Sequence, residues 1–367
     1  MPYSPEFCVW ETTLACNLAC RHCGSSAGKP RANELDTKEA LGVVEALAEL
    51  GTKEITFSGG EVFVRADWRE LIARARQLGI ARIIVSNGLA ITRAIADELA
   101  RLEVGSVSLS IDGTPRVHDW LRPLNSLLAT ELSGPAAGKD ASSHEQIQWA
   151  IENLHAAGVT VSAITQVSKI NLLELPAICD FLVSHGIDGW QIQMTNPMGR
   201  SVKHDGSQRV PTLGPEDLPS LYAFIRRVQD EGKVRCLAAD CIGYFGRDEP
   251  LLRSVEEPND NFWQGCQAGM RVIGLTSDGG VKGCLSMPDA YLEGNLREKP
   301  LREIWRGNDA FAYNRKFTVE SLTGGCSGCA FGKLCRAGCH SFAATAQDGD
   351  ISRYDLCIRV LDPDRAT

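Results

Sequence analysis

Three cysteines, Cys16, Cys20 and Cys23, lie within eight residues near the start of the chain. Three thiolates on one short loop can hold three corners of a four-iron, four-sulfur cluster, which takes four ligands, so one iron is left without a cysteine. An open iron can chelate a small molecule, and a low-potential cluster in contact with that molecule can deliver one electron to it. The spacing disfavours a structural zinc site completed by His22 or Cys8, because zinc sites favour pairs with two-residue gaps. A chance group of core thiols is the weaker alternative.

Seven further cysteines form a second group in the last third of the chain. They are too many for one metal centre and nearly enough for two clusters with four ligands each. A pair of zinc ribbons is the alternative. The seven are Cys266, Cys284, Cys326, Cys329, Cys335, Cys339 and Cys357. The remaining four are scattered, and two of them, Cys8 and Cys179, lie in apolar contexts where a buried thiol behaves as a small hydrophobe.

The composition limits the compartment and the partners. The chain has 367 residues, 14 cysteines and a net charge of 38 minus 46, or -8. No basic tract is present, which disfavours a nucleic-acid partner, and no apolar run reaches the length of a membrane helix. The first residues lack the pattern of a secretory signal, so we expect a cytoplasmic protein. In that compartment clustered cysteines indicate metal more often than disulfides.

The elements that position these cysteines follow a repeating pattern. Amphipathic helical stretches end in glycine and lead into β-rich runs, at Gly51, Gly79, Gly158 and Gly186, and a fifth unit at Gly105 follows the same logic. With a first strand at Phe7–Thr13, about six strands alternate with helices such as 37–50, 66–78 and 171–185. This alternation predicts a parallel sheet, either doubly wound or a full or partial βα barrel.

Polar and glycine-rich segments follow the predicted strands, where the chemistry of both architectures is located. They are 58–61, 86–88, 110–113 and 194–197. The stretch 123–143 interrupts the pattern and is longer than most βα loops, so it is a surface insertion or a functional lid.

The motif Cys16-x3-Cys20-x2-Cys23, with His22 before its last cysteine, and the Gly59-Gly60-Glu61 segment after the second strand resemble those of radical S-adenosylmethionine (SAM) enzymes. The resemblance covers roughly residues 5–235. It implies a partial (βα)6 barrel whose three cysteines hold a cluster, with the methionine amino and carboxylate groups of SAM on the open iron. In this family the electron cleaves the sulfonium and yields a 5′-deoxyadenosyl radical that abstracts hydrogen.

The same resemblance assigns the contacts to SAM, although each such residue could instead be a turn or strand-end cap. Gly59, Gly60 and Glu61 correspond to the motif that holds the methionine amino group; Val62 stands where the family has proline. The carboxylate would be held by Ser110 and Arg122, the ribose by Ser86 and Asn87, and the adenine by Met194.

The second cysteine group resembles the SPASM extension, which carries two auxiliary clusters. We therefore expect a radical SAM core over 1–235 and a small α+β SPASM domain over 236–367; the segment 294–305 also resembles this extension. The resemblance implies a distal cluster on Cys326, Cys329, Cys335 and Cys357 and a nearer one on Cys266, Cys284 and Cys339. The fourth ligand of the nearer cluster could be Cys236, Cys241, the substrate or a non-cysteine group.

SPASM enzymes act mostly on peptides, so the first hypothesis is oxidation or crosslinking of a precursor peptide. Leu285, after Cys284, counts against a sulfatase maturase, which has an aspartate there. Because the barrel begins almost at Met1, recognition of a leader peptide would need a separate protein or the barrel mouth. A flavodoxin or ferredoxin would supply electrons, and Asp240 is a weak candidate for a general base. A small-molecule radical SAM enzyme and a non-catalytic metal scaffold are the alternatives.

Overall fold

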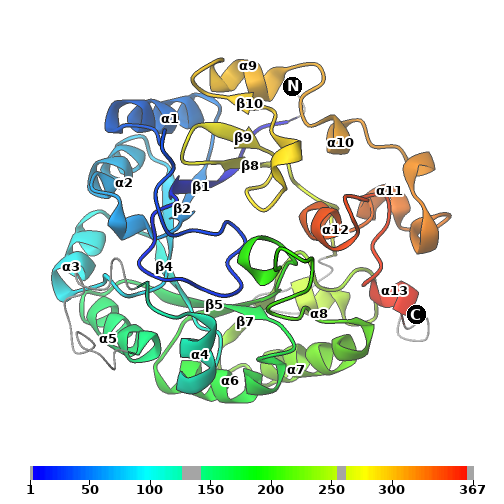
Figure 1. Cartoon of the computed structure of the whole chain (residues 1–367), viewed down its shortest axis with the longest axis horizontal. Helices are drawn as coiled ribbons and strands as arrows, with labels where there is room; N and C mark the ends of the chain where they lie inside the picture. The colour runs from blue at the N-terminus through cyan, green and yellow to red at the C-terminus, as the bar shows by residue number, and fades with distance from the viewer. Residues whose placement is uncertain (1–2, 126–141, 254–261, 362–367) are drawn as a thin grey trace.

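The computed structural model describes residues 3–125, 142–253 and 262–361, and this part contains one ten-stranded sheet (Figure 1). The strand order is β10-β9-β8-β1-β2-β3-β4-β5-β6-β7. Strands β1 to β7 are all parallel and follow chain order, β8 pairs in parallel with β1, and β9 and β10 are antiparallel additions. The strands are β1 (Phe7–Thr13), β2 (Glu54–Gly59), β3 (Ala81–Ser86), β4 (Ser106–Ser110), β5 (Val161–Val167), β6 (Gly189–Met194), β7 (Arg235–Ala238), β8 (Val272–Leu275), β9 (Gly280–Lys282) and β10 (Gly294–Asn295).

The sheet curls into an open barrel with helices on its outside (Figure 1). Strands β7 and β10 form the two edges and are not paired with each other in the described residues, so the predicted partial barrel is confirmed, with two more parallel strands, β7 and β8, than the six expected. The barrel helices are α1 (Thr37–Glu49), α2 (Trp68–Gln77), α3 (Arg93–Arg101), α4 (Pro115–Leu121), α5 (Ser143–Ala156), α6 (Leu175–Ser184) and α7 (Leu218–Glu231).

Most of the C-terminal helices lie on the open side of this barrel, between β9 and α7 in Figure 1, whereas α9 lies outside the sheet next to α1. They are short: α8 (Glu249–Arg253), α9 (Leu301–Arg306), α10 (Ala312–Arg315), α11 (Gly332–Cys335), α12 (His340–Ala346) and α13 (Ile358–Leu361). No helix in the described ranges is long and apolar enough to cross a membrane.

The helix boundaries follow local sequence signals. Helix α1 begins after Asp36, whose carboxylate accepts from the backbone of Glu39 while the Glu39 carboxylate accepts from Asp36 N, a complete capping box. Its predicted range is correct to within one residue. Helix α6 begins at Leu175 rather than at Asn171, because residues Leu172–Glu174 form a separate 3-10 turn.

Four of the five predicted helix-ending glycines adopt the left-handed backbone that disfavours a side chain, at φ values of 83°, 72°, 75° and 63° for Gly51, Gly79, Gly158 and Gly186. The fifth expectation is wrong. In that unit Glu103 takes the left-handed conformation, with φ 53°, and Gly105 is not among the positive-φ residues. Gly105 instead lies directly before β4, and its N–H donates to Arg82 O at 2.9 Å.

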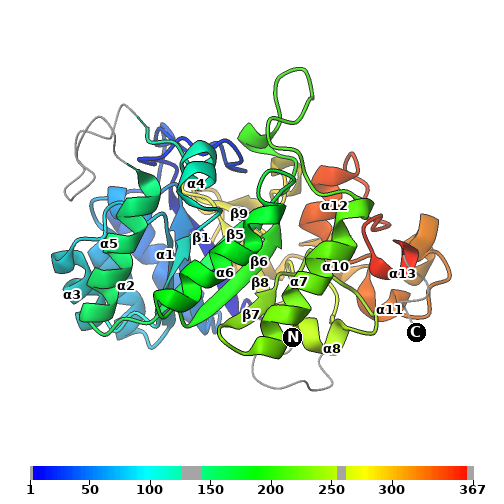
Figure 2. The same ribbon diagram turned by 90° about the horizontal axis from the view of Figure 1, so that it is seen from below.

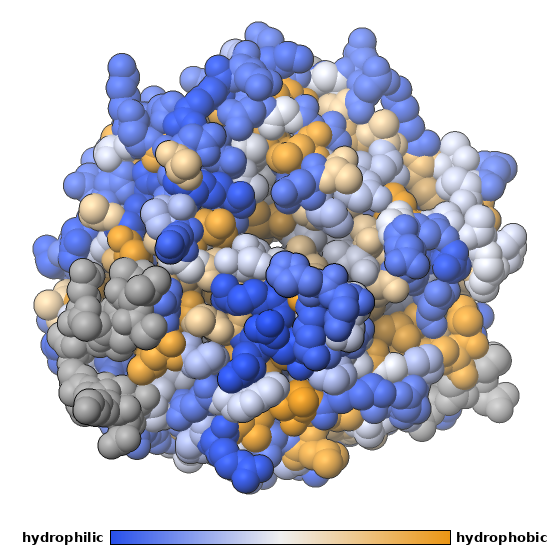
Figure 3. All heavy atoms as spheres, in the orientation of Figure 1, coloured by the Kyte–Doolittle hydropathy of each residue, from blue (hydrophilic) through white to orange (hydrophobic). Residues whose placement is uncertain are grey.

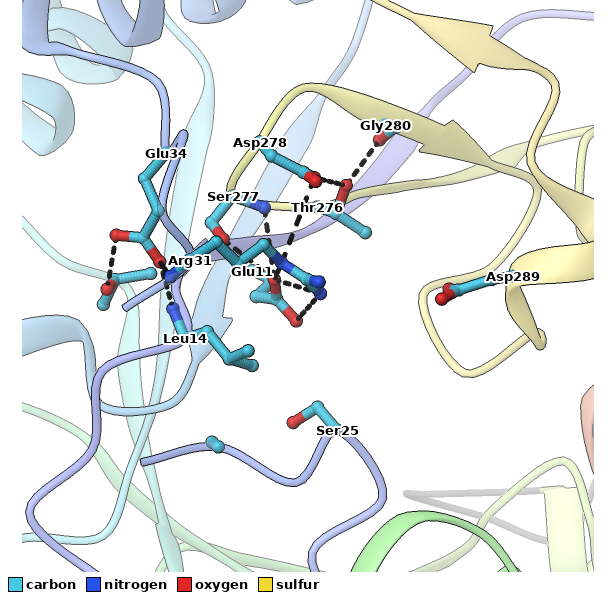
Figure 4. A network of polar contacts seen from close by, with 12 residues as sticks. Glu11, Leu14, Ser25, Arg31, Glu34, Thr276, Ser277, Asp278, Gly280 and Asp289 are labelled. Atoms are coloured by element: carbon cyan, nitrogen blue, oxygen red, sulfur yellow. Dashed lines mark hydrogen bonds and ion pairs between the residues drawn. The ribbon is translucent and has the colours of Figure 1, made fainter. Parts of the chain in front are cut away.

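The C-terminal segment is tied to the start of the barrel by a buried carboxylate (Figure 4). Glu11, on β1, is 2% exposed and accepts from Ser277 Oγ at 3.0 Å and from Arg31 Nε at 3.0 Å. Glu34 accepts from Leu14 N at 2.7 Å at the beginning of the cysteine loop. These bonds fix the β8–β9 turn against the loop that follows β1. Most of the insertion expected at 123–143 lies outside the described residues.

Candidate active site

The loop after β1 brings Cys16, Cys20 and Cys23 to the carboxyl end of the parallel strands. Cys16 and Cys20 pack with Leu18, Ala27 and Leu89 in a small apolar cluster of their own. The loop closes on itself, since Cys16 N donates to Gly28 O at 3.0 Å and Gly28 N to Leu14 O at 2.9 Å.

Each of these three thiols accepts an N–H from the surrounding protein. Leu18 N donates to Cys16 Sγ at 3.4 Å, Ala27 N to Cys23 Sγ at 3.3 Å and Arg122 Nη1 to Cys20 Sγ at 3.9 Å. Donors of this kind stabilise the thiolate form, which is the form that binds iron. Burial raises the pKa of Cys20 to about 11 in the metal-free chain, so iron binding must displace a proton there. The loop therefore fits an iron–sulfur cluster.

Gly59 and Gly60 allow the end of β2 to approach this loop closely. A Cβ on Gly60 would lie 2.1 Å from Ala15 O, and one on Gly59, whose φ is 131°, would lie 2.4 Å from Thr13 O. Any side chain would push the two strand ends apart. Glycine is required here by packing between the strand ends, which is a structural reason independent of any ligand.

Glu61 is 1% exposed and points towards the end of β3. Its carboxylate accepts from Ser86 Oγ at 2.9 Å and from Asn87 N at 2.9 Å. Burial raises the pKa of Glu61 to about 7, against the lowering effect of these hydrogen bonds.

Glu61 gives a pH-dependent prediction. Because its folded pKa lies above the ordinary value of about 4.3, the folded state binds the proton more tightly, and the free energy of unfolding falls as the pH rises between those values. Glu61→Gln removes this titration. We therefore expect the unfolding free energy of the variant minus that of the parent to increase by on the order of 2 kcal/mol as the pH is raised from 5 to 8. Urea unfolding at several pH values measures it. A difference independent of pH would contradict it.

Arg122 is held by a fully buried carboxylate that sequence analysis did not single out. Asp112, 0% exposed, accepts from Arg122 Nε at 2.5 Å and lies 2.9 Å from His22 Nε2 in the cysteine loop. Gln166 N, on β5, donates to its other oxygen at 2.9 Å. Burial alone would raise the pKa of Asp112, but Arg122 and His22 outweigh burial and hold it well below its usual range. Asp112 therefore joins the cysteine loop, α4 and β5.

These elements surround a cavity of about 440 Å³ at the barrel mouth. Figure 3 shows this face hollowed near its centre, with hydrophobic atoms in the hollow and hydrophilic residues around it. The sequence-predicted residues that line it are Cys16, Cys20, Cys23, Gly59, Gly60, Ser86, Asn87, Ser110, Arg122 and Cys284. Glu61 and Met194 are not among its lining residues. Met194 N instead donates to Cys241 Sγ at 3.3 Å.

Two further features of the cavity had no clear sequence signal. Gln166, Gln191 and Gln193, from β5 and β6, line its wall with side-chain amides. Arg200, from the loop after β6, donates from Nε to Cys20 O at 2.7 Å and from Nη1 to Ala27 O, while its Nη2 is buried without a partner. The loop after β6 thus holds the cysteine loop from the side, and both lie at the top of Figure 2.

Four of the C-terminal cysteines line a second cavity, of about 320 Å³: Cys326, Cys329, Cys335 and Cys357. The four thiols are those that the resemblance groups as the distal set. Arg336, Ala337 and Gly338 all have positive φ, so the chain turns sharply between Cys335 and Cys339. That turn separates Cys339 from this cavity.

Cys339 lies near the thiols of Cys241 and Cys266. The neighbouring Cys266 and Cys241 thiols add to burial in raising the pKa of Cys339 well above its ordinary value, and Cys266 acts in the same way on Cys284. Tyr244 joins Cys241 to Cys339, because its hydroxyl donates to Asp240 O and accepts from Cys339 N at 2.9 Å. Asp240 lies beside this group and does not line the barrel-mouth cavity.

Cys236 has different surroundings. It is 2% exposed on β7, and the thiol that acts on its pKa, after burial, is Cys179 of α6. Among the described residues, no three His, Cys, Asp or Glu side chains lie close enough to bind one metal ion directly. Ligands of a four-iron cluster are spread around a larger body.

An open βα barrel with a cysteine loop at its mouth and two further thiol groups beside it defines an iron–sulfur enzyme. Residues 10–182 match the model of the radical SAM superfamily, and residues 266–330 match the iron–sulfur cluster-binding SPASM domain. The AdoMet-dependent heme synthase of Oleidesulfovibrio alaskensis is 30% identical over 95% of this chain and 86% of its own length. The chain therefore belongs to the radical SAM superfamily and carries a SPASM domain. As a radical SAM enzyme it uses SAM and iron–sulfur clusters.

Other similar proteins act in different processes. The mycofactocin maturase MftC of Mycobacterium tuberculosis is 28% identical over 92% of this chain and 78% of its own length. Among solved structures, Streptococcus suis SuiB bound to precursor peptide SuiA superposes with a TM-score of 0.70, covering 96% of this chain and 75% of that chain at 16% identity. That structure shares the fold.

Proposed function

We propose that the protein oxidises or crosslinks a side chain of a peptide at the barrel-mouth cavity, using one SAM-binding cluster and two auxiliary clusters. Cleavage of bound SAM would supply the adenosyl radical that removes hydrogen from the substrate. The observation that carries the proposal is the convergence of Cys16, Cys20, Cys23 and Cys284 on one cavity. The hydrogen-abstraction site and the nearer auxiliary group then face the same substrate.

The residues of the cavity suit the parts of SAM. Arg122 keeps Nη2 available for a carboxylate while Asp112 holds its Nε, and Ser110 lies on the same wall. Gly59 and Gly60 line the cavity, and backbone carbonyls at this position suit the cationic amino group. Ser86 and Asn87 serve the ribose. In this assignment Glu61 acts mainly by holding the β3 end that carries Ser86 and Asn87. Met194 does not line the cavity, so its assignment to the adenine rests on the family resemblance alone.

The side chains that line the cavity favour a peptide over a large flat ring. About 440 Å³ is near the low end for a ligand pocket, and SAM and the first cluster would take up most of it. With either kind of substrate, most of the molecule would therefore lie outside this cavity. The amides of Gln166, Gln191 and Gln193 can pair with peptide groups, and the described lining includes no Phe, Tyr or Trp side chain to stack on a flat ring. The peptide named in the SuiB structure is consistent with this substrate class.

A tetrapyrrole is the second candidate. The heme synthase relative spans nearly the whole chain, and the unpaired Nη2 of Arg200 could receive a carboxylate of such a molecule. The charge on the cavity wall suits an acid, but the described lining offers no Phe, Tyr or Trp ring to stack on the macrocycle.

The test is anaerobic co-expression with a short peptide encoded beside the gene. We expect a mass loss of about two hydrogens in the peptide, absent with the Cys16→Ala, Cys20→Ala, Cys23→Ala variant. The same preparation is then given iron tetrapyrroles of the kind named in the relatives. An unmodified peptide together with a modified tetrapyrrole would overturn the peptide proposal.

We propose that Cys241 is the fourth ligand of the nearer auxiliary cluster, with Cys266, Cys284 and Cys339. Two contacts support it: Met194 N donates to its sulfur, and Tyr244 connects its loop to Cys339. Cys236, the other upstream candidate, lies beside Cys179 instead.

This pair of cysteines provides a matched experiment. Cys241→Ser should lower the iron content by up to about four irons of about 12 per chain and remove one auxiliary signal from the electron paramagnetic resonance (EPR) spectrum. Cys236→Ser should keep both. Equal iron content in the two variants would show that the fourth position is filled by something else.

A further inference from the structure

The hydroxyl group of Tyr313 is buried beside the nearer auxiliary thiols and has no hydrogen-bond partner. A buried hydroxyl without a hydrogen-bond partner is destabilising, so its position calls for an acceptor. The ring is otherwise well packed, edge-on to Tyr291 with 5.2 Å between ring centroids.

The helix that carries this tyrosine is fixed to the first nearer thiol. Asn314, the next residue on α10, donates from Nδ2 to Cys266 O at 2.7 Å and to Ala268 O at 2.9 Å. Arg315 Nε donates to Gly269 O at 2.7 Å. These hydrogen bonds fix α10 to the segment that begins at Cys266. They therefore also fix the position from which the Tyr313 side chain projects.

The hydroxyl oxygen lies directly over the residue before Cys284. A Cβ on Gly283 would lie 2.1 Å from Tyr313 Oη, so only glycine leaves room for the phenol. The Cys266 and Cys284 thiols lie close enough to act electrostatically on the Tyr313 hydroxyl. A phenol, with an ordinary pKa of about 10, is protonated at neutral pH and is a neutral donor.

We propose that Tyr313 donates a hydrogen bond to a sulfur of the nearer auxiliary cluster, on its Cys266 and Cys284 side, and so raises the reduction potential of that cluster. The inference rests on the proposed function, in which this cluster accepts an electron after hydrogen abstraction. A donor to the sulfurs stabilises the reduced, more negative cluster and favours its reduction. Tyr313 is a positioning and tuning residue and makes no contact with the barrel-mouth cavity.

The test is a potentiometric titration of the full chain followed by EPR. Cys16→Ala, Cys20→Ala and Cys23→Ala are included in every sample, so that only auxiliary clusters contribute. We expect Tyr313→Phe to shift the midpoint potential of the nearer cluster to a more negative value and to leave the distal cluster unchanged. Tyr291→Phe, which removes the neighbouring hydroxyl, should leave both midpoints as in the parent.

A second variant separates the hydrogen bond from packing. Fluorotyrosine at position 313 keeps the ring and is a stronger donor, so the nearer midpoint should shift in the positive direction. An unchanged nearer midpoint with fluorotyrosine, or equal shifts of both clusters in Tyr313→Phe, would overturn the inference. A parent protein that shows only one auxiliary signal would instead refute the two-cluster proposal.

Discussion

Replacing Cys16, Cys20 and Cys23 together by alanine should abolish formation of 5′-deoxyadenosine from SAM under reducing conditions. The three thiols each accept an N–H from the protein and line the one cavity that also contains Ser110 and Arg122. Cys284 and His22 also line this cavity, but two remaining side chains do not replace three thiolates on one loop as ligands of the first cluster. The measurement is chromatographic quantification of 5′-deoxyadenosine after anaerobic incubation with dithionite.

Iron content provides the control for this variant. Since the other thiol groups lie outside the cysteine loop, the triple variant should retain on the order of 8 of about 12 irons, together with the auxiliary EPR signals. A variant that kept all its iron, or that still produced 5′-deoxyadenosine, would contradict the assignment of the first cluster.

The second large effect is expected at Asp112. Asp112→Ala leaves the Arg122 guanidinium, which is 10% exposed, without its counter-charge, and breaking a buried pair in this way costs about 3–5 kcal/mol. The contact with His22 in the cysteine loop is lost as well. We expect the free energy of unfolding to fall by that amount and the affinity for SAM to fall with it, because Arg122 loses its orientation. Urea unfolding and equilibrium binding of SAM measure the two effects.

An exposed ion pair on α3 is the matched control. Arg93 and Asp97 are 55% and 48% exposed, and such a pair four residues apart contributes about 0.3–0.5 kcal/mol. Asp97→Ala should therefore change stability little and SAM affinity not at all. If Asp112→Ala were as mild as Asp97→Ala, the buried pair would not be what holds Arg122.

The strand and helix order of the barrel was predictable because each unit repeats the same local signals. Capping at Asp36 and the left-handed glycines at Gly51 and Gly79 are determined within a few residues of chain. The exception at Gly105 has a local cause, since Glu103 turns the chain two residues earlier. The closing strands β8 to β10 were harder to predict, because they depend on pairing between β1 and a segment more than 250 residues away.

The grouping of the cysteines was predictable for a different reason. Their spacing is a property of the sequence, and the structure gathers four of them, including Cys326 and Cys357, around one cavity. The choice between Cys236 and Cys241 was not predictable from the sequence, because both follow β6. Only the folded structure shows that different thiols lie beside each of them. Asp112 was missed because its importance comes from three elements that meet around one buried carboxylate.

The central claim is that a peptide side chain loses hydrogen at the barrel-mouth cavity. The most direct measurement is mass spectrometry of 5′-deoxyadenosine formed in the presence of the neighbouring peptide, deuterated at its side chains. The proposed function predicts one deuterium in 5′-deoxyadenosine and a corresponding loss in the peptide. Unlabelled 5′-deoxyadenosine with an intact peptide, or label transferred only from a deuterated tetrapyrrole, would contradict it.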